Sequence, residues 1–105
     1  MANWIVVKGK KVDLEKATLL GVYQFANPSD FNYVREELYK TAKGNYLLVG
    51  EGGANSKYAE QIATRTSAGG EKKYFISKEE AIRLLEKWHE EESLLEEFGD
   101  ELEEA

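Results

Sequence analysis

Cysteine is absent from this chain of 105 residues, and histidine, proline and methionine each occur once. Without cysteine there can be no disulfides, thiolate zinc sites, iron–sulfur clusters or cysteine nucleophiles. The single histidine, His89, excludes a metal site built from several histidines of one chain. No Gly-x-Ser-x-Gly motif is present either. We therefore predict a non-enzymatic protein with no metal and no cofactor.

Long hydrophobic runs are also missing. The longest cover residues 4–7 and 46–49, whereas a membrane-spanning helix needs about 20 apolar residues. The first residues do not place a basic segment before an apolar one, as a secretory signal would. We expect a cytoplasmic protein with no membrane partner. Because 42% of the residues are hydrophobic and 11% are aromatic, one folded domain with its own core is expected.

Positive charge is scarce in the last quarter of the chain. Residues 1–78 hold 12 basic and 8 acidic side chains, a net charge of +4, whereas residues 79–105 hold 2 basic and 12 acidic side chains, a net charge of −10. This pattern indicates a mildly basic body with a strongly acidic C-terminal segment. Such a segment is typical of a solvated helix face. Alternatively, it meets a basic partner or imitates a nucleic-acid backbone.

The C-terminal segment also carries the clearest helical signal. Ser77, followed three positions later by Glu80, forms a capping-box pattern. Apolar residues then recur at helical spacing. We expect one long helix over residues 78–98, which at ~1.5 Å per residue is roughly 31 Å long. The part beyond His89 is expected to project, and self-association through it would give a homodimer.

Strand-forming residues are concentrated earlier in the chain, in segments 4–7, 18–25, 37–41, 45–50 and 72–76. Between two of these segments, Ala42-Lys43-Gly44 predicts a hairpin turn in which Gly44 takes a positive φ. Residues 57–63 predict a short helix capped by Asn55 or Ser56, and residues 64–70 predict a loop.

Together these elements predict an α+β fold. We expect an antiparallel sheet of about four strands, with a short helix and a long C-terminal helix packed on one face. Residues 1–89 are expected to form a single domain, and residues 90–105 an acidic C-terminal helical extension.

A glycine-rich loop, residues 50–57, leads into the expected short helix. The backbone amides around Gly52, Gly53 and Ser56 could hold an anion, with Lys57 adding positive charge. The spacing fits neither the phosphate-binding loop nor the dinucleotide-binding pattern. A turn that needs glycine for its backbone alone is the alternative interpretation.

Three other groups of residues allow a chemical and a structural interpretation. His89 beside acidic residues is typical of a helix surface rather than of catalysis. The spacing of Glu86, Glu90 and Glu97 would suit a hard cation, but no calcium-loop pattern is present and a solvated face explains them better. The six tyrosines would suit base stacking among lysines, or half-buried strand positions.

Short motifs run through the middle of the chain: ELYKT at 37–41, KGNY at 43–46, GEGGA at 50–54, SKYA at 56–59, GGE at 69–71 and EEA at 79–81. As a set they resemble, over about residues 36–88, a group of small bacterial proteins of unknown function often found on phages and other mobile elements. This chain departs from them at residues 75–77, where they often have an apolar-Pro-Leu segment, and it extends past their usual end. The resemblance implies no activity. A mobile-element setting implies an inhibitor of a host defence complex, for example of the CRISPR type.

We therefore predict a non-catalytic protein-interaction module, whose partner is another protein such as a nucleic-acid-binding defence complex. The acidic helix would supply the contact residues, which are Glu86, Trp88, Glu90, Glu91, Glu97 and Phe98. The alternative is a nucleic-acid or nucleotide-binding module that uses the basic body and the loop 50–57. An enzyme of unknown type ranks third.

Overall fold

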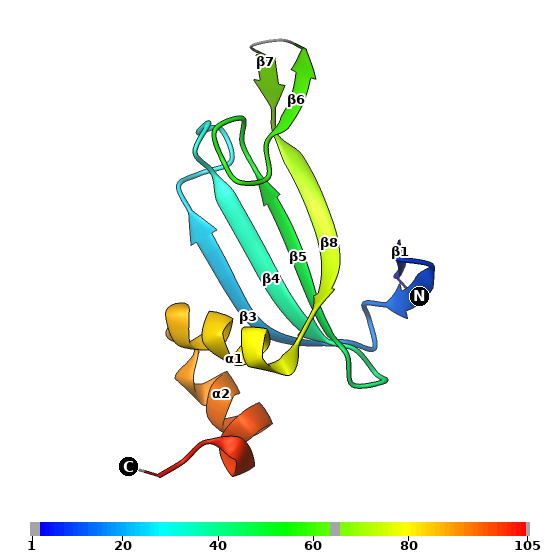
Figure 1. Cartoon of the computed structure of the whole chain (residues 1–105), viewed down its shortest axis with the longest axis vertical. Helices are drawn as coiled ribbons and strands as arrows, with labels where there is room; N and C mark the ends of the chain where they lie inside the picture. Colours follow the sequence, from blue (N-terminus) through cyan, green and yellow to red (C-terminus); the bar gives the residue numbers. More distant parts are fainter. Residues whose placement is uncertain (1–2, 64–65, 105) are drawn as a thin grey trace.

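The structure is a computed structural model that describes residues 3–63 and 66–104 (Figure 1). Its strands are β1 (Trp4–Val7), β2 (Lys10–Asp13), β3 (Thr18–Phe25), β4 (Val34–Lys40), β5 (Tyr46–Gly52), β6 (Glu60–Ala63), β7 (Thr66–Ala68) and β8 (Gly70–Ile76). Its helices are α1 (Lys78–Lys87), α2 (Glu91–Phe98) and the short 3-10 helix η1 (Gly99–Glu101). The α+β class expected from the sequence is confirmed.

The centre of the molecule is an antiparallel sheet of four strands in the order β3-β4-β5-β8. Leu38, Leu48 and Tyr74 stand side by side across β4, β5 and β8. The predicted hairpin turn between β4 and β5 is confirmed, since Gly44 has a φ of +90°. The Thr41 amide closes this turn by donating to the Asn45 carbonyl at 2.8 Å. The antiparallel sheet of about four strands is therefore present as expected.

One face of this sheet, called here the helical face, is covered at one end by α1 and α2 (Figure 1). The buried residues of the two helices and the sheet form one cluster: Leu20, Leu38, Leu48, Ala81, Leu85, Trp88, Leu94 and Phe98. A register shift between Leu19 and Gly21 bends β3 at this point. A side chain at Gly21 would come within 2.9 Å of the Leu85 methyl Cδ2, so glycine lets the helix approach the strand.

The opposite face is partly covered by a hairpin made of β1 and β2. Val7 and Val12 pack from the hairpin against Leu47 of the sheet. The hairpin turns through Lys8 and Gly9, whose φ values of 49° and 77° suit the two-residue type I′ turn. The molecule thus has a layer on each side of its central sheet.

The expected single helix over residues 78–98 is wrong, because the chain reverses after Trp88. His89 takes a φ of 60°. The Glu90 amide then donates to the Leu85 carbonyl at 2.9 Å, and the His89 amide donates to the Glu86 carbonyl at 3.1 Å. These two bonds form a Schellman motif, which usually has glycine where His89 stands. The capping box at the start of α1 is confirmed by the Glu80 amide, which donates to the Ser77 hydroxyl at 3.2 Å.

The short helix expected over residues 57–63 is also wrong. Residues 60–63 form β6, which pairs with β7 in a hairpin beyond the end of the central sheet (Figure 1). The preceding residues form tight turns, in which the Ser56 amide donates to Gly53 and the Ala59 amide donates to Ser56. The loop expected over residues 64–70 is wrong where Thr66–Ala68 forms β7, and residues 64 and 65 lie outside the described part.

Candidate functional site

The loop between β5 and β6 occupies the end of the helical face that the helices leave uncovered. Residues two apart along a strand share a face, so Gly50 points the same way as Leu48. The Tyr58 ring lies directly on Gly50, where any side chain would overlap it. Gly50 is therefore required to seat Tyr58, which is 2% exposed.

A buried carboxylate lies beneath this tyrosine. Glu36, on the same face as Leu38, is only 3% exposed. It accepts a hydrogen bond from the Tyr58 hydroxyl and pairs with the Lys57 ammonium at 2.8 Å. Burial, followed by the bond to Glu36, raises the pKa of Tyr58. Because the buried charge has both a proton donor and a cation, the group is a satisfied structural network rather than a free acid or base.

The amides of the same loop are used within the chain. The Gly53 amide donates to Tyr33 at 2.9 Å, and the Asn55 amide donates to Phe31 at 2.8 Å. The Ser56 amide donates to Gly53 at 3.0 Å. Gly52 packs so closely on the Ser56 side chain and on the Tyr33 carbonyl that a Cβ there would overlap them. The residues predicted to hold an anion, Gly52, Gly53, Ser56 and Lys57, therefore lie together but are turned to internal partners.

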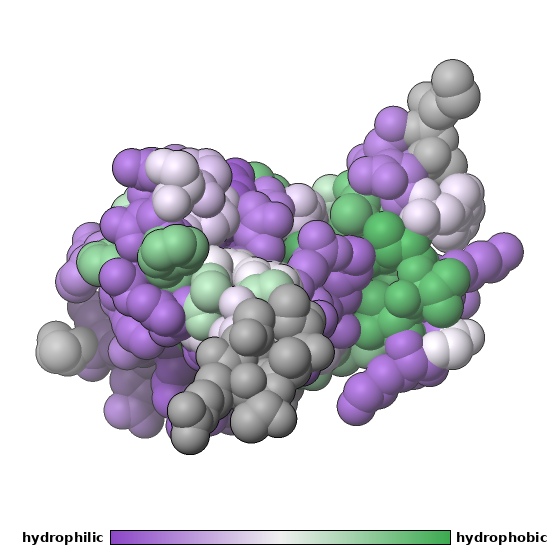
Figure 2. Space-filling view, turned by 90° about the horizontal axis from the view of Figure 1, so that it is seen from above, coloured by the Kyte–Doolittle hydropathy of each residue, from purple (hydrophilic) through white to green (hydrophobic). Residues whose placement is uncertain are grey.

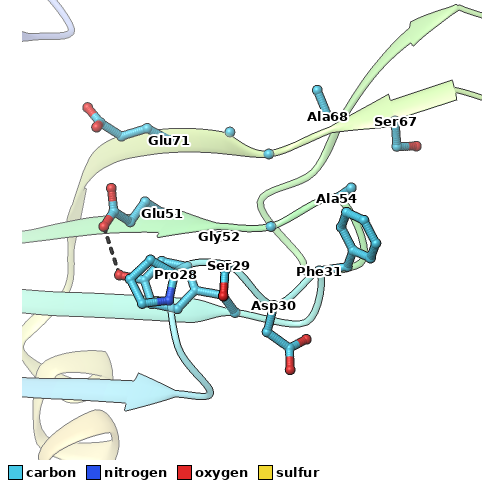
Figure 3. Close-up of a pocket in the computed structure, with 14 residues that line it drawn as sticks. Pro28, Ser29, Asp30, Phe31, Glu51, Gly52, Ala54, Ser67, Ala68 and Glu71 are labelled. Carbon is cyan, nitrogen blue, oxygen red and sulfur yellow. Dashed lines mark hydrogen bonds between the residues drawn. The ribbon is translucent and has the colours of Figure 1, made fainter.

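A cavity of about 690 Å³ lies beside this loop, at the end of the central sheet (Figure 3). Glu51 and Glu71 face each other on neighbouring strands at one side, and Phe31 lies beside Ala54 at the other. The Tyr33 hydroxyl donates to Glu51 at 2.9 Å, and burial, followed by this bond, raises the pKa of Tyr33. Glu71 pairs with Lys73. The carboxylates of Glu51 and Glu71 thus have partners within the chain.

A metal centre is not found in the part of the chain that the structure describes, where no three histidine, aspartate or glutamate side chains converge. Among the same residues, no helix combines the length and apolar character needed to cross a membrane. The tyrosines do not form an open stacking platform. Tyr23 stacks on Trp88 with ring centroids 6.1 Å apart, and Tyr46 packs on Phe98 at 5.4 Å.

The residues predicted for the acidic helix fall into two groups. Trp88 and Phe98 are in the core, at 9% and 2% exposure. Glu97 also faces the sheet, where it pairs with the Lys40 ammonium at 2.6 Å and accepts from the Tyr46 hydroxyl at 3.0 Å. Phe98 and Glu97 thus tie α2 to the sheet, and Trp88 packs the end of α1 into the same core.

The other predicted residues lie further out. Glu86 and Glu91 are exposed, and Glu90 is half-buried beside Gly21. The outer side of α2 carries a set of residues that we call the acidic α2 surface: Glu91, Glu92, Leu95 and Glu96. Leu95 is 66% exposed and follows Glu91 and Glu92 by four and three positions, so the three share one side of the helix.

The contact residues predicted from the sequence did not include Glu92, Leu95 or Glu96. The signal that would have found them is the spacing of Leu94 and Phe98. Four positions apart, these two define an inner side, which leaves Leu95 and its acidic neighbours outside.

Comparisons with known proteins leave the function to be argued from this geometry. No family model matches the chain, and neither a curated protein nor a solved structure does. The resemblance to small mobile-element proteins therefore stays a prediction.

Proposed function

We propose that the protein is a non-catalytic interaction module that binds a basic surface of a partner protein through the acidic α2 surface. The observation that carries this proposal is Leu95, a leucine 66% exposed among three glutamates on the outer side of an anchored helix. Protein interfaces commonly combine an apolar centre with a polar rim. Leu95 supplies such a centre, and Glu91, Glu92 and Glu96 supply an anionic rim.

The inner side of α2 supports the proposal because it holds the surface in place. Leu94 and Phe98 are buried in the core, and Glu97 bonds to Lys40 and Tyr46. A surface that is already ordered loses little conformational freedom on binding, so more of the contact energy appears as affinity.

The negative charge of the acidic α2 surface also supports the proposed binding to a basic partner. Glu97 and Glu101 are neutralised within the chain by Lys40 and Lys78, at 2.6 and 2.7 Å. In contrast, the glutamates of the acidic α2 surface form no ion pair with any residue in the ranges 3–63 and 66–104. An unneutralised anionic patch speeds association with a basic partner and disfavours acidic ones.

The resemblance to mobile-element proteins supports a partner that handles nucleic acid, such as a host defence complex of the CRISPR type. A protein that binds nucleic acid presents basic grooves, because phosphate contacts dominate its affinity. The acidic α2 surface would occupy such a groove in place of the phosphates. The chain would then act as a competitive inhibitor without any turnover.

The test is capture from a host lysate on the immobilised full chain, with matched charge variants. A variant with Glu91→Gln, Glu92→Gln and Glu96→Gln should lose the captured partner by about tenfold or more, and Leu95→Ala should weaken it similarly. A control with Glu79→Gln, Glu103→Gln and Glu104→Gln changes the same charge at other exposed sites and should keep it. Equal capture by the two triple variants would contradict the proposal, because the α2 position would then be irrelevant.

A further inference from the structure

The hairpin β1–β2 presents a second exposed surface, on the opposite face of the sheet from α2. Its inner side is buried through Val7 and Val12. On its outer side, Trp4 is 54% exposed and Val6 is 74% exposed. We define the hairpin surface as these two residues together with Lys11, which stands opposite Val6 on the same face, and the exposed turn residue Lys8.

This surface is visible in the space-filling view. Figure 2 shows hydrophobic surface on the side of the molecule where Figure 1 places β1, with hydrophilic side chains projecting beside it. Single exposed apolar residues are ordinary, but a tryptophan and a valine side by side on one hairpin face are a patch. The hairpin patch and Leu95 lie on different faces of the molecule, and Leu19, Phe25 and Phe31 are further exposed apolar side chains.

The hairpin surface is positively charged. The Lys11 ammonium lies 5.2 Å from the centroid of the Trp4 ring, over its face. Neither this lysine nor Lys8 nor Lys10 pairs with a carboxylate of the described residues. The one acid on the outer side of the hairpin is Asp13, opposite Trp4, and its Oδ1 already accepts from the amides of Asn3 and Glu15.

The surface is also rigid. The two-residue turn at Lys8 and Gly9 fixes the register of the hairpin, in which Val6 stands opposite Lys11. The Lys10 ammonium lies 5.8 Å from the Phe75 ring centroid, which ties the hairpin to β8. The exposed ring and the lysines around it are thus held ready for a ligand.

We propose that the hairpin surface binds single-stranded nucleic acid, with a base stacked on Trp4 and phosphates paired with the neighbouring lysines. A ligand that suits this surface must be anionic and must also offer a flat apolar face. Single strands have both, because their bases are free to stack on an aromatic ring while the backbone carries the charge. In a duplex the base faces are covered by neighbouring bases, and an acidic peptide offers a ring only where it carries an aromatic residue, not one for each charge.

This inference does not depend on the proposed function, because the two surfaces lie on opposite faces of the sheet and share no residue. It does fit a partner that handles nucleic acid, since the acidic α2 surface would contact the protein and the hairpin surface would contact a strand held by it. Binding at the hairpin can be measured with the chain alone.

The test is titration of the full chain with a labelled oligothymidylate at about 50 mM salt, followed by fluorescence anisotropy. Both tryptophans emit, but Trp88 is buried, so a loss of intrinsic emission on binding reports mainly on contact with Trp4. Trp4→Ala should weaken binding about tenfold, while Trp4→Phe, which keeps a ring, should lose less. Changing Lys8 and Lys11 to Gln should lower the slope of log affinity against log salt by about 1.4, at ~0.7 per phosphate contact.

A matched control changes two exposed lysines elsewhere, Lys43 and Lys87, to Gln. It should bind almost as the parent does, and duplex DNA of the same length should bind more weakly than the single strand. The proposal is overturned if the parent does not bind, if Trp4→Ala binds as the parent does, or if the two lysine variants weaken binding equally. Quenching of Trp4 by anionic lipid vesicles but not by the oligonucleotide would overturn it in favour of a membrane surface.

Discussion

The two ends of the helical face are built in opposite ways. At one end, α1 and α2 bury leucines and Phe98 against Leu38 and Leu48. At the other end, the chain buries Glu36, which lies two residues before Leu38 on β4. Tyr58 and Lys57 cover this carboxylate. The first end is held by apolar volume. The second is held by polar partners and by the space that Gly50 leaves.

The two ends are therefore expected to lose different amounts of stability when a side chain is substituted. An apolar core loses stability gradually with the volume removed, because neighbours relax into part of the space. The loss at a buried carboxylate with two partners is not reduced in this way, because removing one partner leaves part of a buried charge without a hydrogen bond or ion pair.

Phe98→Ala should be the most damaging change at the apolar end. Phe98 is 2% exposed and packs on Tyr46, so truncation should lower the free energy of unfolding by about 4 kcal/mol. Urea unfolding monitored by circular dichroism measures this loss. A loss below about 1 kcal/mol would mean that α2 does not belong to the core.

Gly50→Ala should be nearly as damaging at the polar end, although it adds only a methyl group. That methyl would overlap the Tyr58 ring and push the hydroxyl away from Glu36, at a cost of about 3 kcal/mol. Gly99→Ala is the matched control, since nothing lies near its Cβ and its φ of −53° is helical. The control should unfold like the parent. Equal losses of stability in both variants would contradict the overlap with Tyr58 as the cause.

Tyr58→Phe keeps the ring on Gly50 and removes only the hydroxyl. Glu36 then retains Lys57 as a partner, so the free energy of unfolding should fall by about 2 kcal/mol. The same unfolding experiment tests this, and Tyr39→Phe serves as a comparison because its hydroxyl bonds to Glu37 at 3.3 Å. The bond to the buried Glu36 should stabilise the fold more than the bond to Glu37 does. Equal losses of stability in the two variants would contradict this.

His89→Gly should raise stability by about 1 kcal/mol. His89 stands in the left-handed position of the Schellman motif with a φ of 60°, which glycine adopts without steric cost. Thermal unfolding shows the gain as a higher Tm. A lower Tm would mean that the reversal after α1 needs the histidine side chain.

The smallest effect should come from alkaline titration of Tyr46. Burial, followed by the bond to Glu97, raises the pKa of Tyr46 from 10.0 to about 12. A raised pKa means that the fold favours the neutral phenol, so this stabilisation is complete below pH 10 and is lost as the pH rises towards 12. Tyr46→Phe should therefore lose less stability than the parent between pH 10 and 11. Parallel pH profiles would show that the fold does not raise the pKa of Tyr46.

The parts of the fold that follow from local pattern could be predicted from the sequence. Segments rich in strand-forming residues identified the central strands, and Gly44 and Ser77 marked a turn and a helix start. The reversal at His89 could not be predicted, because its usual signal is glycine and the apolar spacing continues through it. The hairpin of β6 and β7 was missed because Asn55 and Ser56 looked like helix caps.

The candidate site was predictable only in part, for a similar reason. Charge counting located the acidic segment, but which glutamates face outward depends on how α2 folds back. Lys40 pairs with Glu97, a contact between distant parts of the chain that no local spacing reveals. The glycines of the loop 50–57 suggested an anion site, whereas Gly50 serves to seat Tyr58. The boundary expected after residue 89 stays a prediction.

The central claim is that α2 is an integral part of the core and thereby holds its acidic side outward. Hydrogen–deuterium exchange of the full chain tests this most directly, by comparing the amides of Leu94 and Phe98 with those of Leu48 and Leu85. The account predicts that all four exchange slowly, within about tenfold of one another, because they open together. Exchange at Leu94 and Phe98 that is about a thousandfold faster, with Leu48 and Leu85 still protected, would contradict it.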